Sequence, residues 1–168
     1  LLASLALCDD GPGAPGTDRA SALLRQGVYT GGGAAKRLYG RLTIGGKLCP
    51  LDVDGGVAML TEPDVVDDPS VQLVLGHTEL NRLNYVKASK WYGNVLTPTG
   101  EGAHDTWAVQ GLMLCWMHDS AVGDAPFNRC ISYLTDPERA ERCINTKMMS
   151  KPLSFMGDCF VKAAERTY

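Results

Sequence analysis

The residues best suited to hold a metal ion are a cysteine and a histidine three positions apart. Cys115-x2-His118 has a spacing that can chelate one ion, and Cys130 and Cys143 follow as further ligand types that zinc accepts. A structural zinc site needs a second close pair, whereas 12 residues separate Cys130 from Cys143. We therefore expect these cysteines to be buried as small apolar side chains, and we predict no metal site and no cofactor.

A cysteine hydrolase is the alternative chemistry, and it needs a thiol nucleophile, a histidine base and an orienting group. On paper Cys49 could act with His77 or His104, and Cys159 could act with His77 and Asp105. These sets are assembled from residues far apart in the chain, and no local motif joins them. We predict no catalytic residue and keep the cysteine or zinc-dependent hydrolase as the alternative function.

One short segment resembles a known nucleophile turn. Gly157-Asp158-Cys159 is similar to the nucleophile turn of chymotrypsin-like viral proteases. That resemblance implies a fold with further strands after the nucleophile. Only nine residues follow Cys159, and their pattern is that of a helix.

Two glycine-containing segments resemble ligand loops in part. Asp52-x-Asp54-Gly55 looks like the opening of a calcium loop, but Gly56 stands where the third oxygen ligand should be. The run Gly31–Lys36 has glycines near a lysine without the spacing of a phosphate-binding loop. We expect a turn at the first segment and a linker at the second.

The cysteine count leaves the redox compartment open. An even number of cysteines permits three disulfides with 15 possible pairings, and none of the spacings is Cys-x-x-Cys. We favour free, buried thiols and assign no localisation. The six cysteines are Cys8, Cys49, Cys115, Cys130, Cys143 and Cys159.

The middle of the chain has a pattern that favours β-strands. Apolar residues alternate over 38–44, Gly45-Gly46 can form a tight turn, and short apolar runs follow at 57–60, 71–75 and 83–88. The segment 107–117 is apolar on all sides, and we interpret it as a central strand because Gly111 would weaken a helix. Strands in direct succession favour an antiparallel sheet, which we place over 37–134.

Helices are expected near both ends of the chain. Residues 17–26 have Thr17 as a cap, with Ala20, Leu23 and Leu24 facing inward and Gly27 as the end. Towards the C-terminus, Thr135 to Glu138 has the form of a capping box, and a last helix is expected to begin near Ser154. The fold class that we predict is thus α+β, a single domain with two C-terminal helices on one face of the sheet. No internal repeat is evident.

Composition places the chain among ordinary folded domains and excludes some partners. Apolar residues make up 45% and charged residues 21% of the 168 residues, with a net charge of −3. That charge argues against nucleic-acid binding, and no apolar run is long enough to span a membrane. We expect an arm and linker over 1–16, whose apolar start is typical of a processed chain, and one domain over 17–168.

These observations together predict an interaction protein and no enzyme. Three tryptophans and six methionines supply apolar surface of the kind that protein interfaces use, and no catalytic constellation is complete. We therefore predict a non-catalytic structural or interaction subunit of a larger assembly, of a viral structural or organelle-complex type. It would act through protein partners or through self-assembly.

Overall fold

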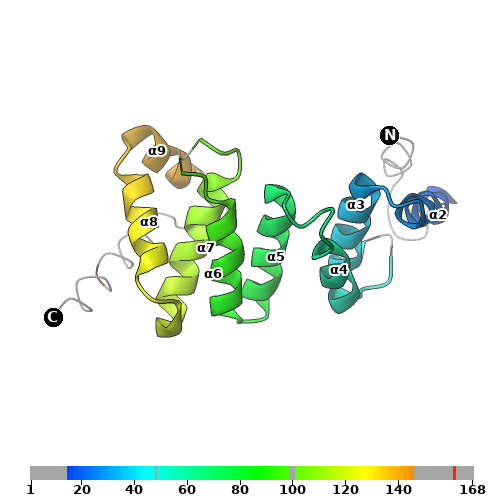
Figure 1. Cartoon of the computed structure of the whole chain (residues 1–168), viewed down its shortest axis with the longest axis horizontal. Coiled ribbons are helices and arrows are strands. Elements are labelled where there is room, and N and C mark those ends of the chain that lie inside the picture. The colour runs from blue at the N-terminus through cyan, green and yellow to red at the C-terminus, as the bar shows by residue number, and fades with distance from the viewer. Residues whose placement is uncertain (1–14, 48, 99–100, 146–160, 162–168) are drawn as a thin grey trace. The chain divides into compact units, whose positions relative to one another are not determined.

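The protein is all-helical wherever its structure is described. A computed structural model describes residues 15–47, 49–98, 101–145 and 161. Every regular element in these ranges is a helix, as Figure 1 shows. The expected α+β class, with an antiparallel sheet over 37–134, is therefore wrong. In chain order the elements are α2 (Pro15–Tyr29), α3 (Gly33–Ile44), α4 (Val53–Leu60), α5 (Pro69–Asn81), α6 (Tyr85–Val95), α7 (Asp105–His118), the 3-10 helix η1 (Ser120–Val122), α8 (Ala125–Leu134) and α9 (Pro137–Asn145).

The segments expected as strands lie inside helices. The alternating run 38–44 falls in α3, the runs at 57–60 and 71–75 fall in α4 and α5, and the run at 83–88 falls in α6 except for its first two residues. Acidic caps begin two of these helices: the Asp52 carboxylate accepts a hydrogen bond from the Gly55 N–H at 2.8 Å, and that of Asp68 accepts one from the Ser70 N–H at 2.8 Å. These caps favour helices at α4 and α5, whereas α3 begins after Gly32 without a side-chain cap.

The helix expected over 17–26 is present, with wider bounds. It is α2, and Ala20 and Leu24 are buried in it while Leu23 is half-buried. Gly27 lies inside this helix and does not end it. A Cβ at Gly27 would come within 2.8 Å of the Ala35 Cβ, so this glycine permits a close approach between α2 and α3.

The capped helix near the C-terminus is also present, but its cap is one residue later than expected. The Asp136 carboxylate accepts hydrogen bonds from the backbone N–H groups of Glu138 and Arg139, at 2.9 and 3.2 Å. Thr135 instead donates its hydroxyl to the Ser132 carbonyl, so the expected capping box is not formed. Of the helix expected from Ser154 only Val161 is described, and it is helical and exposed.

The chain divides into two compact units, residues 1–71 and 72–168. In the first unit α3 packs against both α2 and α4. In the second unit α7 packs against α6, α8 and α9, and α6 to α8 lie side by side in Figure 1. The expectation of one domain over 17–168 stays a prediction.

Helical hairpins recur at a regular interval that the sequence pattern did not reveal. The first helices of three successive hairpins begin at Gly33, Pro69 and Asp105, 36 residues apart in each case. The second helices, α4, α6 and α8, begin at less regular intervals because the connections differ in length.

A tyrosine held between two glycines marks the core of the second unit. A Cβ at Gly76 of α5 would lie 2.8 Å from the Tyr92 ring, and one at Gly111 of α7 would overlap that ring. Tyr92 of α6 is completely buried by this arrangement. Gly111, which we interpreted as a sign of a strand, therefore lies in a central helix because the tyrosine needs the space beside its backbone. The expected strand over 107–117 is wrong for this reason.

No helix in the described part of the chain is both long and apolar enough to cross a bilayer.

Candidate functional site

Arg129 of α8 lies where two pockets of the second unit meet. Its Nη1 donates a hydrogen bond to the Gly93 carbonyl at 3.2 Å, and its Nη2 donates one to the Leu96 carbonyl at 3.0 Å. These carbonyls belong to the C-terminal turn of α6, where backbone acceptors lack partners within the helix. The guanidinium therefore ties α8 to the end of α6 and is itself held in a defined position.

The first pocket is small and polar. Its volume is about 160 Å³, and it brings Arg129 of α8 close to Arg139 of α9. Arg139 lies 5.6 Å from the centre of the Tyr133 ring, and its Nε lies 3.6 Å from an oxygen of Asp136. The described residues that line the pocket include no carboxylate; they are Leu96, Thr97, Pro98, Arg129, Ser132, Tyr133 and Arg139.

A buried carboxylate fixes the loop that closes one side of this pocket. Asp105, at the start of α7, is completely buried and accepts hydrogen bonds from the Thr97 N–H at 3.0 Å, the Thr97 hydroxyl at 2.6 Å and the Gly102 N–H at 2.9 Å. These three bonds compensate for removing the charge from water. Asp105 is thus an anchor of the loop and does not orient a histidine.

The second pocket is a wider groove between α6 and the segment that leads into α8. Its volume is about 430 Å³, and its floor is mainly apolar, with Lys90, Asn94 and Arg129 as its larger polar groups. Again the described lining has no carboxylate. The lining residues are Val86, Ser89, Lys90, Gly93, Asn94, Leu112, Ala121, Val122, Ala125, Pro126 and Arg129.

The four described cysteines are buried and form no disulfide, as the sequence interpretation favoured. They are Cys49, Cys115, Cys130 and Cys143. Burial raises the pKa of Cys115 to about 12 and that of Cys143 to about 11, so both thiols stay protonated at neutral pH. A cysteine nucleophile needs the opposite shift. Cys8 and Cys159 lie outside the described residues.

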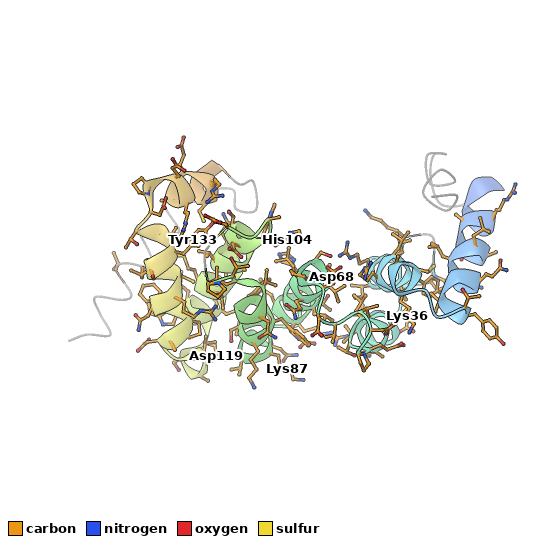
Figure 2. All side chains as sticks on the ribbon, turned by 45° about the horizontal axis from the view of Figure 1, so that its top comes forward. Lys36, Asp68, Lys87, His104, Asp119 and Tyr133 are labelled. Carbon is orange, nitrogen blue, oxygen red and sulfur yellow. The ribbon has the colours of Figure 1, made fainter. Side chains whose placement is uncertain are left out.

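The described contacts of His77 and His118 are with aromatic rings of the second unit. His77 of α5 is half-buried with its ring at 79° to that of Tyr92, and burial lowers its pKa. His118 at the end of α7 is exposed and stacks on Tyr85, with ring centres 5.3 Å apart. His104 precedes α7 and Asp119 follows it, so these two polar residues lie at opposite ends of that helix (Figure 2).

The zinc interpretation finds no support among the described residues. Cys115 is completely buried in α7 while His118 is exposed on the same helix. Within the described part of the chain no three histidine, cysteine or acidic side chains are grouped so that they could hold a metal ion.

The two other ligand-like segments have structural roles. Asp52 caps α4, as described above, and Lys36 is paired with the carboxylates of Glu62 and Asp64 at 2.7 and 2.9 Å. Lys36 and Asp68, labelled in Figure 2, both belong to the first unit, and each is paired with an opposite charge. Asp52 and Lys36 are thus used in contacts within the protein, and neither segment forms a phosphate or cation site.

The pockets beside Arg129 went unrecognised in the sequence. Arg129 and Arg139 are ten positions apart on separate helices, and no spacing rule joins residues across a helix boundary. The only usable signal is that apolar positions of α8 (Phe127, Cys130, Tyr133) leave Arg129 and Ser132 on the other faces of that helix. Comparisons with protein-family models, with curated proteins and with solved structures found no match to this chain.

Proposed function

We propose that this protein is a non-catalytic interaction subunit that holds a protein partner in the two pockets beside Arg129. The observation that carries this proposal is the pair of adjoining pockets, lined from several helices by basic and apolar side chains together. Interfaces combine an apolar centre with arginine in this way. Repeated helical hairpins also serve widely as scaffolds that present such surfaces.

The buried chemistry of the second unit agrees with a binding role. The cysteine thiols that a hydrolase would use are inside the core with raised pKa values, and Asp105 is used in a loop anchor. The polar groups that reach a cavity are instead guanidinium, ammonium, hydroxyl and amide groups. Such groups bind a partner surface and provide no nucleophile with an adjacent base.

Gly93 offers a way to test the groove without changing its charge. A Cβ at Gly93 would meet only the Nη1 of Arg129, at 3.7 Å, which is ordinary van der Waals contact. Gly93→Ala should therefore fold normally, whereas the longer side chain of Gly93→Leu would occupy the groove. The two variants form a matched pair, because both replace the same glycine near the C-terminal end of α6.

The experiment is quantitative affinity purification of the full chain from cells of its own organism, comparing wild type, Gly93→Ala and Gly93→Leu. We expect a partner that wild type and Gly93→Ala retain and that Gly93→Leu loses by about tenfold or more. Sedimentation of the pure variants reports whether that partner is a second copy of the chain. Identical recovery from all three forms, or no specific partner at all, would contradict the proposal.

A further inference from the structure

We propose that the pocket between Arg129 and Arg139 receives a carboxylate side chain from an acidic segment of the protein partner. This inference rests on the proposed interaction function and names the chemistry of the partner. It starts from a local reversal of charge: the whole chain carries −3, yet the described linings of both pockets contain Lys90, Arg129 and Arg139 and no acidic residue. Complementary charge at an interface favours an acidic partner.

The donors in the pocket match a carboxylate. A guanidinium has five N–H donors in a planar fork, and the two hydrogen bonds from Arg129 to Gly93 and Leu96 leave three of them for a ligand. Because these two bonds already hold the Arg129 side chain in place, little side-chain entropy remains to be lost on binding. The exposed hydroxyl of Ser132 adds a donor at the same wall.

The net charge around the pocket favours a carboxylate over a phosphate. The two guanidiniums carry two positive charges, and Asp136 beside Arg139 neutralises one of them in part. Between one and two positive charges are therefore left, which is enough for a monoanion and short of the near-dianion of a phosphorylated side chain. The acidic balance of the whole chain likewise disfavours a nucleic-acid backbone.

The groove on the other side of Arg129 suggests how the segment continues. Arg129 belongs to both linings, so a chain that crosses it places neighbouring side chains in the two pockets. The groove floor of Val86, Leu112 and Val122 suits a small apolar side chain. The partner segment is thus an extended peptide in which an acidic residue is followed or preceded by small apolar residues.

The test uses a fluorescein-labelled peptide of alternating glutamate and alanine, with alternating glutamine and alanine of equal length as its uncharged control. Fluorescence anisotropy on the full chain should show that the glutamate peptide binds about tenfold or more tightly than the control. Arg139→Gln should weaken binding of the glutamate peptide by about tenfold. The matched variant Arg142→Gln removes the same charge from an exposed position of α9 outside the pocket, and it should change binding about twofold or less.

A second pair of variants keeps both arginines. Ser132→Asp places a carboxylate of the protein's own at the pocket wall and should abolish binding of the glutamate peptide, whereas Ser132→Asn should retain it. Equal binding of the two peptides, no binding of either, or equal effects of Ser132→Asp and Ser132→Asn would overturn the proposal. A phosphoserine peptide that binds at least tenfold more tightly than the glutamate peptide would overturn the choice of carboxylate.

The two proposals fail separately. If Gly93→Leu loses a cellular partner while the glutamate peptide does not bind, the interaction function stands and the carboxylate pocket is wrong. If the glutamate peptide binds but Gly93→Leu recovers every cellular partner as well as wild type does, the pocket binds a carboxylate and the groove is not the interaction site.

Discussion

Both units bury apolar side chains, Leu24, Leu60 and Val65 among those of the first, but the contacts that join their helices differ. In the first unit α3 is joined to the segment after α4 by charged groups: Lys36 contacts Glu62 and Asp64, and the Nε of Arg37 lies 3.4 Å from Asp68. In the second unit a continuous apolar core joins α6, α7, α8 and α9. Its largest members are Tyr92 and Trp116, both almost completely buried.

This difference predicts which substitutions lower the stability of each unit. Partly exposed ion pairs contribute little each and are screened by salt, so the first unit should tolerate the loss of any one of them. A close-packed core responds to every change of volume, so the second unit should be damaged by single substitutions. Residue-resolved hydrogen exchange can follow the two units separately, because each helix reports its own protection.

The largest effect is expected from Tyr92→Ala. Removing a fully buried aromatic side chain should lower the free energy of unfolding of the second unit by about 3 to 5 kcal/mol. Tyr92→Phe is the control. The Tyr92 hydroxyl is buried without a hydrogen-bond partner in the described structure, so its removal should leave stability unchanged or increase it. If Tyr92→Ala and Tyr92→Phe lost hydrogen-exchange protection equally, packing of the aromatic ring would not be the cause.

The next effect is expected from Gly111→Ala. The new Cβ would overlap the Tyr92 ring, and overpacking a rigid core costs about 1 to 3 kcal/mol. Chemical denaturation of the variant, followed by the tryptophan fluorescence of the second unit, measures this loss. Unchanged stability would show that α6 and α7 can separate freely and that the tyrosine does not determine their distance. In that case the second unit would tolerate single substitutions, as we expect of the first.

A smaller effect is expected from Asp68→Ala, at the end of the first unit and the start of α5. Asp68 accepts hydrogen bonds from the Ser70 backbone and hydroxyl and so caps α5. Loss of an N-cap costs about 1 kcal/mol. The neighbouring Asp67 is exposed, so Asp67→Ala removes the same charge without the cap and should change thermal stability much less. Equal losses in the two variants would assign the effect to net charge alone.

The same contrast explains why the sequence misled us about fold class. Residues 38–44 alternate in polarity, but they lie on a helix whose inner face is set by small residues such as Gly40, next to Leu60. A glycine that permits close packing is read from sequence as a helix breaker, as with Gly111. The helices α4 and α5 do carry local signals, namely the caps Asp52 and Asp68 and Pro69 in the first turn of α5. We interpreted Asp52 as part of a turn.

The site could be predicted only in part for a related reason. Burial of the described cysteines followed from their apolar neighbours, which are local in sequence. The pocket beside Arg129 depends on how α8 and α9 meet the end of α6, a long-range arrangement that no local pattern encodes. The 36-residue recurrence of the helical hairpins is similarly a property of helix positions, since the second helices are spaced unevenly.

The smallest expected effect is the dependence of stability on pH. It differs between the units because different groups titrate in each. Burial against Tyr92 lowers the pKa of His77, so folding favours its neutral form. The unfolded chain then binds more protons, and the second unit should lose stability as the pH falls through the usual histidine value of about 6.5. His77→Gln should remove this loss, while His118→Gln, at an exposed position, should keep it.

The first unit should respond at lower pH. Hydrogen bonds from Ser70 lower the pKa of Asp68, so the stability that its charge provides is present above the ordinary value of 3.8 and is lost as the pH falls through the lowered one. Hydrogen exchange measured between pH 7.5 and pH 5 should therefore show α6 and α7 losing protection while α3 and α4 keep theirs. If both units weaken together in that interval, or if His77→Gln changes nothing, burial of His77 does not govern the acid response. The contrast between the continuous apolar core of the second unit and the ion pairs of the first would then have to rest on the packing variants alone.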